Sequence, residues 1–414
     1  MTTASHRTLA PSRLRTLAPS HLRTLALTLV TFAGAFAPSY AQTSNDLFDE
    51  GAVQTLQITI HSRDWESLRV NFTSNDFYPA DVAWNGLRVR NVGIRSRGLG
   101  SRSGVKPGLE VNFAHYSSRG QFLGMRALVL DNLITDPSMI RERVAMAFLR
   151  RFGVPAPREV HAQLYVNGQY WGLYAIVEPI DSVFLERTLG ENTGTLYEYH
   201  WLQPYFGTFL GENLDLYPPF FEPRTRETQS TFDLFDPIRE LFRTISSAPA
   251  ASFRDAVNPR LDLESTLRLI AGESFLAEWD GILGYAGMNN FYLYLSGSSA
   301  QARLFPWDAD HTFQAADYPL LAGAAENVLM RRMLEDPVLQ ARYFQLVNEA
   351  IGVAMSGDWL VREVISQYQQ IRDAALADTL KPYTNEEFDA AFAELLTIAR
   401  TRPAFVAQQV QQNQ

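Results

Sequence analysis

The sequence predicts an α+β protein with two lobes: a β-rich N-terminal lobe that carries one main helix, and a helix-rich C-terminal lobe. Two observations support this prediction. Between residues 53 and 177, short segments alternate apolar and polar residues, and Asn-Gly pairs typical of β-hairpins separate some of them. From residue 263 onward, apolar residues recur at helical spacing, interrupted by one short pair of strands.

Residues 1–41 have the layout of a secretory signal peptide, and we exclude them from the fold. A basic lead without any acidic residue precedes the apolar run Leu25–Ala37, and small residues lead up to Ala41. The run is shorter than the roughly 20 residues that a membrane-spanning helix needs. We therefore predict a secreted or periplasmic protein with no transmembrane segment after removal of the signal.

The charge and the cysteine content exclude several classes of function. The chain has a net charge of −9, and loss of the four arginines in the signal leaves 32 basic against 45 acidic residues, a net charge of −13. A chain with this negative charge is a poor candidate for binding to nucleic acid or to anionic membranes. The absence of cysteine excludes disulfides, thiolate catalysis and cysteine-bound zinc.

The N-terminal lobe, residues 42–180, is expected to contain the strands and one helix. Asp136 is expected to cap this helix with Pro137 in its first turn, and Gly153 to end it. The turns Asn85-Gly86 and Asn167-Gly168 predict hairpins. The predicted strands are 56–60, 82–84, 89–95, 109–113, 128–130, 160–166 and 170–177.

The remaining chain divides into an inserted crossover region, 181–262, and a helical lobe, 263–414. Residues 191–260 are rich in proline and aromatic residues without a lasting period, which predicts loops with short helices. Residues 263–278 are predicted to be helical, followed by a strand pair at 290–295 and 303–305. After residue 327 the pattern is helical throughout, with Thr384 and Glu387 forming a capping box before the last helix.

Two carboxylates at Asp308 and Asp310 follow the second strand of that pair, in the stretch Pro306-Trp307-Asp308-Ala309-Asp310. Side chains two residues apart in an extended segment point the same way, so both could meet one cation. Hard cations such as Mg²⁺ prefer carboxylate oxygens, and two acids in an apolar setting need a counter-charge. The alternative interpretation is a turn in which one aspartate caps a loop and the other faces solvent.

A second candidate site lies at Asp280, in a glycine-containing loop after a predicted helix. Asn289 and Asn290 open the next strand. The order Asp280, Asn290, Asp308 fits phosphoryl transfer, in which a loop acid orients the acceptor hydroxyl while an amide and a carboxylate hold the metal. The alternative interpretation is that Asp280 and Asn289 only cap loops.

Five stretches, taken together and in this order, resemble the CotH kinase-like family, named for a spore coat protein. The resemblance covers roughly residues 53 to 313, with a helical tail beyond. The stretches are Gly93–Gly98 with Ser101-Arg102 and Lys106-Pro107; Leu128–Asn132 with Asp136–Ser138 and Ile140-Arg141; Leu164–Tyr174 with Val177-Glu178; Asp280 with Asn289–Tyr294; and Pro306–Asp310.

The resemblance implies an atypical protein kinase of reduced kinase fold, using ATP and Mg²⁺ (or Mn²⁺) on an exported protein substrate. Lys106 would then contact the phosphates, and Glu178 to Ile180 would lie beside the adenine. Asp280 would be the catalytic acid–base residue. The metal ligands implied are Asn290 and Asp308, and Asp310 is expected to be a second ligand or an orienting group.

Three positions depart from the family pattern. The loop from Arg97 to Ser101 lacks the family's asparagine, although its backbone still offers donors for phosphate. Asn289 replaces the family's histidine. Glu142 stands where the family often has asparagine, and could pair with Lys106 as the helix glutamate does in ordinary kinases. Because Glu142 lies away from the apolar stripe of its helix, a solvated position is the alternative.

The sequence is compatible with three functions. The leading hypothesis is an exported kinase that phosphorylates Ser or Thr. The first alternative is a catalytically silent surface, matrix or adhesion protein whose aromatic insertion forms a contact surface, unless those aromatic residues only pack over the core. A divalent-metal hydrolase at Asp280, Asp308 and Asp310 is the third. The aromatic residues are Tyr197, Tyr199, Trp201, Tyr205, Phe206, Phe209, Tyr217, Phe220 and Phe221.

Overall fold

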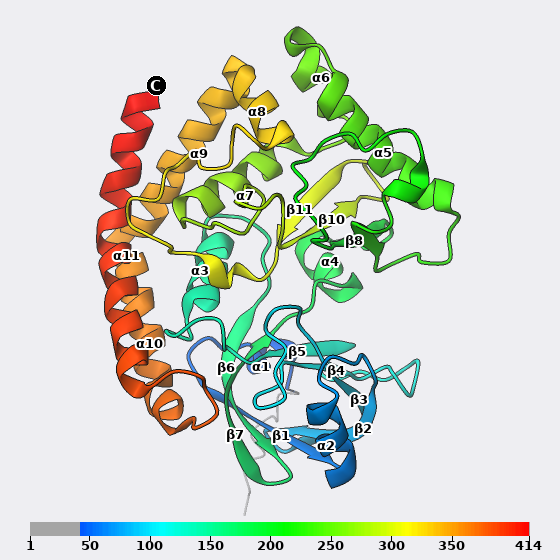
Figure 1. Ribbon diagram of the computed structural model, residues 1–414, viewed down its shortest axis with the longest axis vertical. Helices are drawn as coiled ribbons and strands as arrows, with labels where there is room; N and C mark the ends of the chain where they lie inside the picture. The colour runs from blue at the N-terminus through cyan, green and yellow to red at the C-terminus, as the bar shows by residue number, and fades with distance from the viewer. Residues whose placement is uncertain (1–41, 414) are drawn as a thin grey trace, which may run out of the picture. The chain divides into compact units, whose positions relative to one another are not determined.

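The computed structural model describes residues 42–413, and it confirms the α+β class (Figure 1). The predicted signal peptide lies outside the described residues. The strands are β1 (Gln54–Ile60), β2 (Tyr78–Trp84), β3 (Leu87–Ser96), β4 (Leu109–Asn112), β5 (Ala127–Asp131), β6 (Glu159–Val166), β7 (Gln169–Val177), β8 (Thr195–Tyr199), β9 (Phe221–Pro223), β10 (Phe291–Leu295) and β11 (Ala302–Pro306). The α-helices are α1 (Ser44–Leu47), α2 (Ser62–Val70), α3 (Arg141–Arg151), α4 (Ser182–Leu189), α5 (Thr231–Ser247), α6 (Phe253–Val257), α7 (Leu263–Phe275), α8 (Val328–Glu335), α9 (Pro337–Met355), α10 (Trp359–Ala377) and α11 (Asn385–Asn413). The short 3₁₀ helices are η1 (Leu214–Leu216), η2 (Ala250–Ser252), η3 (Ala309–His311) and η4 (Ser356–Asp358).

The N-terminal strands close into a barrel in the order β1-β2-β3-β4-β5-β7-β6, and the parallel pair β1–β6 completes the ring. Strand β1 alternates buried and exposed residues along its whole length, so one face fills the barrel interior. The Asn-Gly turns at 85–86 and 167–168 have positive φ at both residues, as hairpin turns require. Both predicted hairpins are therefore confirmed.

Helix α3 starts later than the sequence predicted. It begins at Arg141 with Ile140 as N-cap, five residues after Asp136. Asp136 still caps the helix, because its carboxylate accepts hydrogen bonds from the backbone N–H groups of Ile140 (2.9 Å) and Arg141 (2.8 Å). The intervening residues form a turn in which Met139 has a φ of 58°. The C-terminal prediction holds, since the helix ends at Arg151, two residues before Gly153.

We expect Asp136→Ala to destabilise the protein by about 2 kcal/mol, because buried backbone donors at the start of α3 lose their acceptor. Urea unfolding of the purified variant measures this. Asp136→Asn, which keeps one acceptor oxygen, should fall between the wild type and the alanine variant. Equal stability of all three proteins would contradict this account of the helix start.

The region predicted as irregular loops is more regular than expected. Strands β8 and β9 extend the β10–β11 hairpin into a four-stranded sheet of order β11-β10-β8-β9. Helix α5 is 17 residues long and continues through Pro237. Most of the predicted aromatic surface is packed inside, so these rings form core, not an exposed platform. The buried rings are Tyr197, Tyr199, Tyr205, Tyr217, Phe220 and Phe221.

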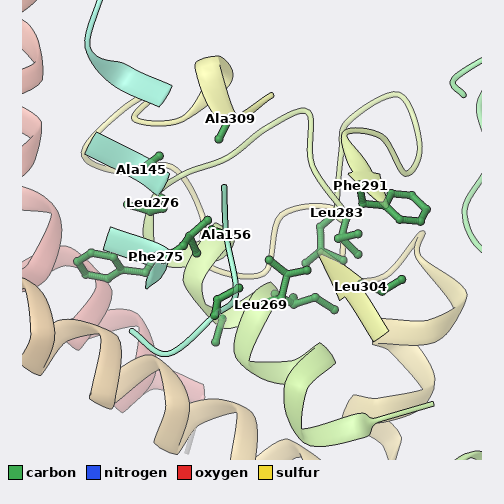
Figure 2. Close-up of a cluster of buried hydrophobic side chains, with 14 of the residues drawn as sticks. Ala145, Ala156, Leu269, Phe275, Leu276, Leu283, Phe291, Leu304 and Ala309 are labelled. Carbon is green, nitrogen blue, oxygen red and sulfur yellow. The ribbon is translucent and has the colours of Figure 1, made fainter. Parts of the chain in front are cut away.

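The large apolar core of the molecule joins the outer face of the barrel to the helices. Figure 2 shows part of this core: Ala145 of α3 lies beside Leu276, Leu304 of β11 lies on the same side as Leu283, and Leu269 of α7 lies between the two groups. Residues from the 181–262 region belong to this same cluster, and a separate cluster fills the barrel. No helix within residues 42–413 is long and apolar enough to cross a membrane.

The C-terminal helices α10 and α11 form a hairpin along one side of the molecule, from the barrel to the helix-rich part (Figure 1). The predicted capping box precedes α11, with reciprocal hydrogen bonds between Thr384 and Glu387. Arg402 of α11 is fully buried and donates to the carbonyl oxygens of Phe275 (2.9 Å) and Ser274 (2.7 Å). The hairpin is therefore an integral part of the fold.

Candidate functional site

Asp280 is held in one orientation by two amides. Its Oδ2 accepts hydrogen bonds from Asn289 Nδ2 (3.0 Å) and from Asn290 Nδ2 (3.2 Å), and its backbone N–H donates to Glu278 (2.7 Å). Burial raises the pKa of the Asp280 carboxyl above its ordinary value. With Oδ2 occupied by amides, Oδ1 is the oxygen left to accept a proton from another group.

Asn290 and Asp308 lie at the ends of paired strands. Strand β10 pairs with β11 so that Phe291 faces Pro306, and the Trp307 N–H donates to the Asn290 carbonyl (2.9 Å). Both residues adopt left-handed backbone, with φ of 56° at Asn290 and 51° at Asp308. Among non-glycine residues, Asn and Asp adopt this backbone most readily, so the two residue types suit these positions.

The Asn290 side chain divides its two polar atoms between two tasks. Its Nδ2 also donates to the Asp280 carbonyl (3.2 Å), so the amide nitrogen is committed to Asp280. The amide oxygen is left for another partner. An amide oxygen and a carboxylate are ligands that Mg²⁺ and Mn²⁺ accept, so the donors at Asn290 and Asp308 fit a hard cation.

The carboxylates around Asp308 repel one another. Burial, and then the charge of Asp131 at the end of β5, raise the pKa of Asp308 to about 6, while Arg97 acts in the opposite direction. Asp310 lies in η3, and its Oδ2 accepts a hydrogen bond from Thr135. Burial and the neighbouring Asp308 raise its pKa. A cation between these groups would relieve their repulsion.

Arg97 is the positively charged side chain that the structure brings toward Asp308. Its guanidinium lies 5.5 Å from the ring centroid of Trp307, the residue before Asp308. Arg102 fixes the loop that follows by donating to the carbonyls of Gly98 (2.7 Å) and Phe72 (3.2 Å). The carbonyl of Ser101 accepts from Asn132 Nδ2 (2.9 Å), which ties the loop to the end of β5.

Lys106 has different neighbours from those the sequence suggested. Its Nζ is buried and donates to Asp378 Oδ2 and to the Leu173 carbonyl, both at 2.7 Å. The expected pairing of Lys106 with Glu142 is therefore wrong, and so is its alternative of a solvated Glu142. Glu142 is buried, and burial together with Glu159 and Asp308 raises its pKa well above the ordinary value.

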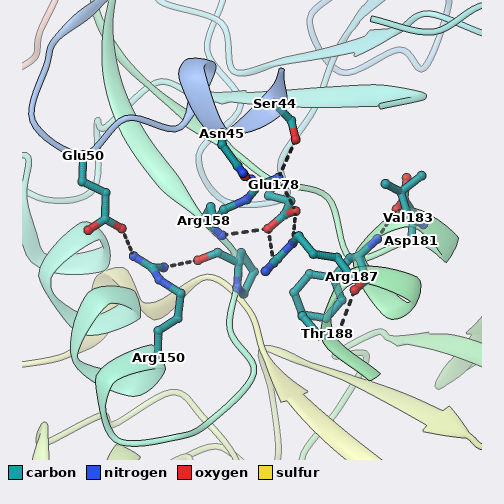
Figure 3. Close-up of polar contacts among 12 residues, drawn as sticks. Ser44, Asn45, Glu50, Arg150, Arg158, Glu178, Asp181, Val183, Arg187 and Thr188 are labelled. Carbon is teal, nitrogen blue, oxygen red and sulfur yellow. Dashed lines mark hydrogen bonds and ion pairs between the residues drawn. The ribbon is translucent and has the colours of Figure 1, made fainter. Parts of the chain in front are cut away.

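Glu178 at the linker between the two parts is committed to ion pairs. Its carboxylate lies 2.8 Å from Arg158 and 2.6 Å from Arg187, as Figure 3 shows. The side chain of Ile180 packs into a small apolar cluster with Phe184 and Tyr292. Both side chains are thus occupied, and the linker offers only its backbone to a ligand.

Sequence reasoning missed some residues near the site. Asp131 was not predicted as a site residue, although its charge acts on Asp308, Asp310 and Lys106. Its position at the carboxyl end of a buried strand was the available signal. Burial, and then the charges of Asp136, Asp310 and Asp131, raise the pKa of Tyr383, and no local pattern in the sequence indicated this.

Among the described residues, one set of three side chains has ligand atoms close enough together to hold a metal ion, and it lies outside this site. It consists of Glu198, His200 and Glu222 on and beside β8 and β9. Arg224 lies 3.5 Å from Glu198 and 3.3 Å from Glu222, and His200 contacts Glu222 at 2.8 Å. These groups therefore already compensate one another's charge.

Comparison with known proteins gives concordant results. The family model described as CotH kinase protein matches residues 94–406. Inner spore coat protein H of Bacillus subtilis is 25% identical over 80% of this chain and 91% of its own length. Spore coat protein homolog 1 of Rhizopus delemar is 22% identical over 71% of this chain and 50% of its own length.

A solved structure, that of the Helicobacter pylori proinflammatory kinase CtkA, matches 74% of this chain and 94% of its own, at 9% identity and a TM-score of 0.30. A likeness this distant carries no argument about individual residues. The match to the family model covers most of the chain and includes every residue of the candidate site. The chain belongs to the CotH kinase protein family.

Proposed function

We propose that this protein is an exported kinase that transfers the γ-phosphate of ATP to Ser or Thr of another exported or surface protein. The observation that carries the proposal is the arrangement of Asp280, Asn290 and Asp308. Two amide nitrogens orient the acid, and Asn290 and Asp308 flank the paired ends of β10 and β11. Membership of the CotH kinase family supports the same reaction class.

Asn290 and Asp308 would hold Mg²⁺ or Mn²⁺, with Asp310 as a further ligand or as a group that orients Asp308. When bound, the cation supplies charge neutralisation at the phosphates. Asp310 is itself oriented by Thr135, and Arg141 of α3 donates to the Thr312 carbonyl (3.2 Å) just after η3. This contact fixes the segment on which both aspartates lie.

Asp280 would accept the proton of the attacking hydroxyl. Its Oδ2 is fixed by Asn289 and Asn290, so Oδ1 would be the oxygen that takes the proton. Burial raises its pKa, which makes it a better proton acceptor than an exposed aspartate. The role of the protein is mainly to position the acceptor and to stabilise charge.

For the nucleotide, Arg97, Ser101 and Lys106 would bind phosphate, and the backbone from Glu178 to Ile180 would contact the adenine. Arg97 carries a charge that already acts on Asp308. Since the Glu178 carboxylate is held by two arginines, a contact to adenine there must use main-chain groups. The aromatic rings that suggested a binding platform are mostly buried, which removes the observation behind that alternative.

We expect Asp280→Asn to lower phosphate transfer by about 10²–10⁴-fold, because the variant loses its general base. Nucleotide binding should persist, since the metal ligands remain. Labelled ATP measures transfer to the protein itself, and the melting temperature with ATP and Mn²⁺ measures binding. Asp317→Asn, an exposed aspartate in the segment after η3, is the matched control. No nucleotide-dependent rise in the wild-type melting temperature would contradict the proposed function.

A further inference from the structure

The chain has only two lysines among its 36 basic residues, and both contact the same aspartate. Lys106 lies just before β4 in the barrel. Lys381 lies in the segment 378–384 that joins α10 to α11, which we call the α10–α11 loop, and its Nζ donates to the Asp378 carbonyl (3.1 Å). Every other basic side chain in the sequence is an arginine. The two lysines therefore mark one place in the fold, where the barrel meets the C-terminal hairpin.

Both carboxylate oxygens of Asp378 are hydrogen-bonded at this junction. Its Oδ2 accepts hydrogen bonds from Lys106 Nζ (2.7 Å) and from the Leu173 N–H of β7 (2.9 Å). Its Oδ1 accepts from the N–H groups of Leu380 (2.9 Å) and Lys381 (3.1 Å). The carboxylate is fully buried. A buried carboxylate with four donors is a fixed charge.

Gly172 is required for this approach. Its φ is 111°, and a Cβ at this position would lie 2.5 Å from Asp378 Oδ2. Only glycine adopts this backbone freely and leaves room for the carboxylate. The close packing of β7 against Asp378 is thus specified at three points: Gly172, Leu173 and Lys106.

Lys106 connects this junction to the candidate site. Its ammonium uses two of its three donors, on Asp378 and on the Leu173 carbonyl, and its Nζ lies 5.0 Å from the ring centroid of Tyr174. Asp131 is the second acid whose charge acts on Lys106, and the same carboxylate acts on Asp308. Asn132, the residue after Asp131, donates to the Lys106 carbonyl (2.8 Å). Lys106 therefore lies beside the end of β5 that carries Asp131, one member of the acidic cluster formed by Asp131, Asp308 and Asp310.

We infer that Asp378 is the positioning residue of Lys106, in the role that a helix glutamate has in ordinary kinases, and that the α10–α11 loop completes the nucleotide site. This inference rests on the proposed function, because Lys106 affects transfer only where a nucleotide binds beside it. Glu142 does not supply the partner. The loop also carries Tyr383, whose pKa is raised by burial and then by the charges of Asp136, Asp310 and Asp131.

The charged groups around Lys106 determine the direction in which its pKa is shifted. Burial lowers the pKa of Lys106; Asp378 and Asp131 raise it, and Lys381 lowers it. Tyr174 contributes a ring face to the ammonium. If Asp378 is neutralised, Asp131 is the one carboxylate left to offset burial. Lys106 should then lose its proton at a lower pH than in the wild type.

Biosynthetic labelling with [¹³C]lysine tests the inference in the intact chain, because it yields two lysine signals, which Lys381→Arg assigns. In Asp378→Asn, we expect the Lys106 signal to titrate at least about one pH unit lower than in the wild type. Affinity for a non-hydrolysable ATP analogue with Mg²⁺ should fall at least about tenfold more at pH 9 than at pH 6, since the lysine loses its charge as the pH rises. Asp373→Asn, an exposed aspartate on α10, should change neither measurement.

A purely structural role for Asp378 would lower affinity equally at both pH values, and that result overturns the inference. If Asp378→Asn does not fold, the wild-type protein provides the test. Adding the ATP analogue and Mg²⁺ should then change the NMR chemical shift of Lys106. An unchanged chemical shift would overturn the inference. If the wild type binds no nucleotide, the proposed function fails separately. The part of the inference that concerns the nucleotide site then fails with it. The lysine titration still shows whether Asp378 determines the pH at which Lys106 loses its proton.

Discussion

Asp308→Asn should lower phosphate transfer by about 10²–10³-fold or more, because the variant loses the carboxylate that stabilises charge at the phosphates. The cause is loss of ligand charge and not of structure. An amide has the same shape, and burial of the wild-type carboxyl, whose pKa is about 6, is itself unfavourable. The variant should therefore be at least as stable as the wild type at pH 8. Transfer from labelled ATP at saturating Mn²⁺ measures the effect.

The control for this variant is Asp317→Asn, which removes an exposed carboxylate nine residues further along the chain. Its transfer rate should equal that of the wild type. A variant at Asp308 that keeps most of its activity would show that the cation is held elsewhere. Raising the Mn²⁺ concentration should partly restore Asp308→Asn, because the amide oxygen is a weaker ligand and not an absent one.

Glu273→Gln should abolish a pH dependence of stability that the wild type carries. Glu273 of α7 is buried behind the Asp280 loop, and its Oε2 accepts one hydrogen bond from the Ile282 N–H (3.0 Å). Burial raises its pKa from 4.5 to about 8. The folded protein thus holds this proton up to about pH 8, whereas the unfolded chain releases it near its ordinary value.

The direction of this pH dependence follows from the thermodynamic linkage between proton binding and folding. A carboxyl whose pKa is raised by folding favours the folded state at low pH, and this contribution is lost as the pH rises from about 4.5 to about 8. Relative to the wild type, Glu273→Gln should gain up to roughly 4 kcal/mol between pH 5 and pH 9. Urea unfolding at both pH values measures the difference. Glu326→Gln, an exposed glutamate, should parallel the wild type, and parallel curves for Glu273→Gln would contradict the account.

The strands and their turns could be predicted because their information is local. At Asn85-Gly86 and Asn167-Gly168, two residues that tolerate positive φ separate alternating segments, and nothing distant alters that preference. Helix α5 also had a local pattern, since Leu234, Ile238 and Leu241 recur at helical spacing after the N-cap Ser230. Pro237 and the surrounding aromatic residues masked that pattern.

The start of α3 was mispredicted for a different reason. An aspartate before a proline usually opens a helix, but here the Asp136 carboxylate turns to bond with N–H groups four and five residues later. This requires the left-handed backbone at Met139. Tertiary contacts around the acidic cluster, and not local preference, determine this turn.

In the candidate site too, some residues could be predicted from local sequence, whereas contacts between distant residues could not. Asp280, Asn290 and Asp308 could be predicted as candidate site residues because each adjoins a recognisable element and the three occur in an order that fits phosphoryl transfer. The partner of Lys106 could not be found, since Asp378 is 272 residues away and no spacing relates the two. The buried position of Glu142 was also missed, because the helix buries polar residues on more than its apolar stripe.

The most direct test is a crystal structure with Mn²⁺ and a non-hydrolysable ATP analogue, in which anomalous scattering locates the metal. We predict a Mn²⁺ ion about 2.0–2.3 Å from Asn290 Oδ1 and from an Asp308 oxygen, with phosphates between it and Arg97. A metal at Glu198, His200 and Glu222 with none at Asn290 would contradict the account. So would a nucleotide bound away from the segment between Arg97 and Lys106.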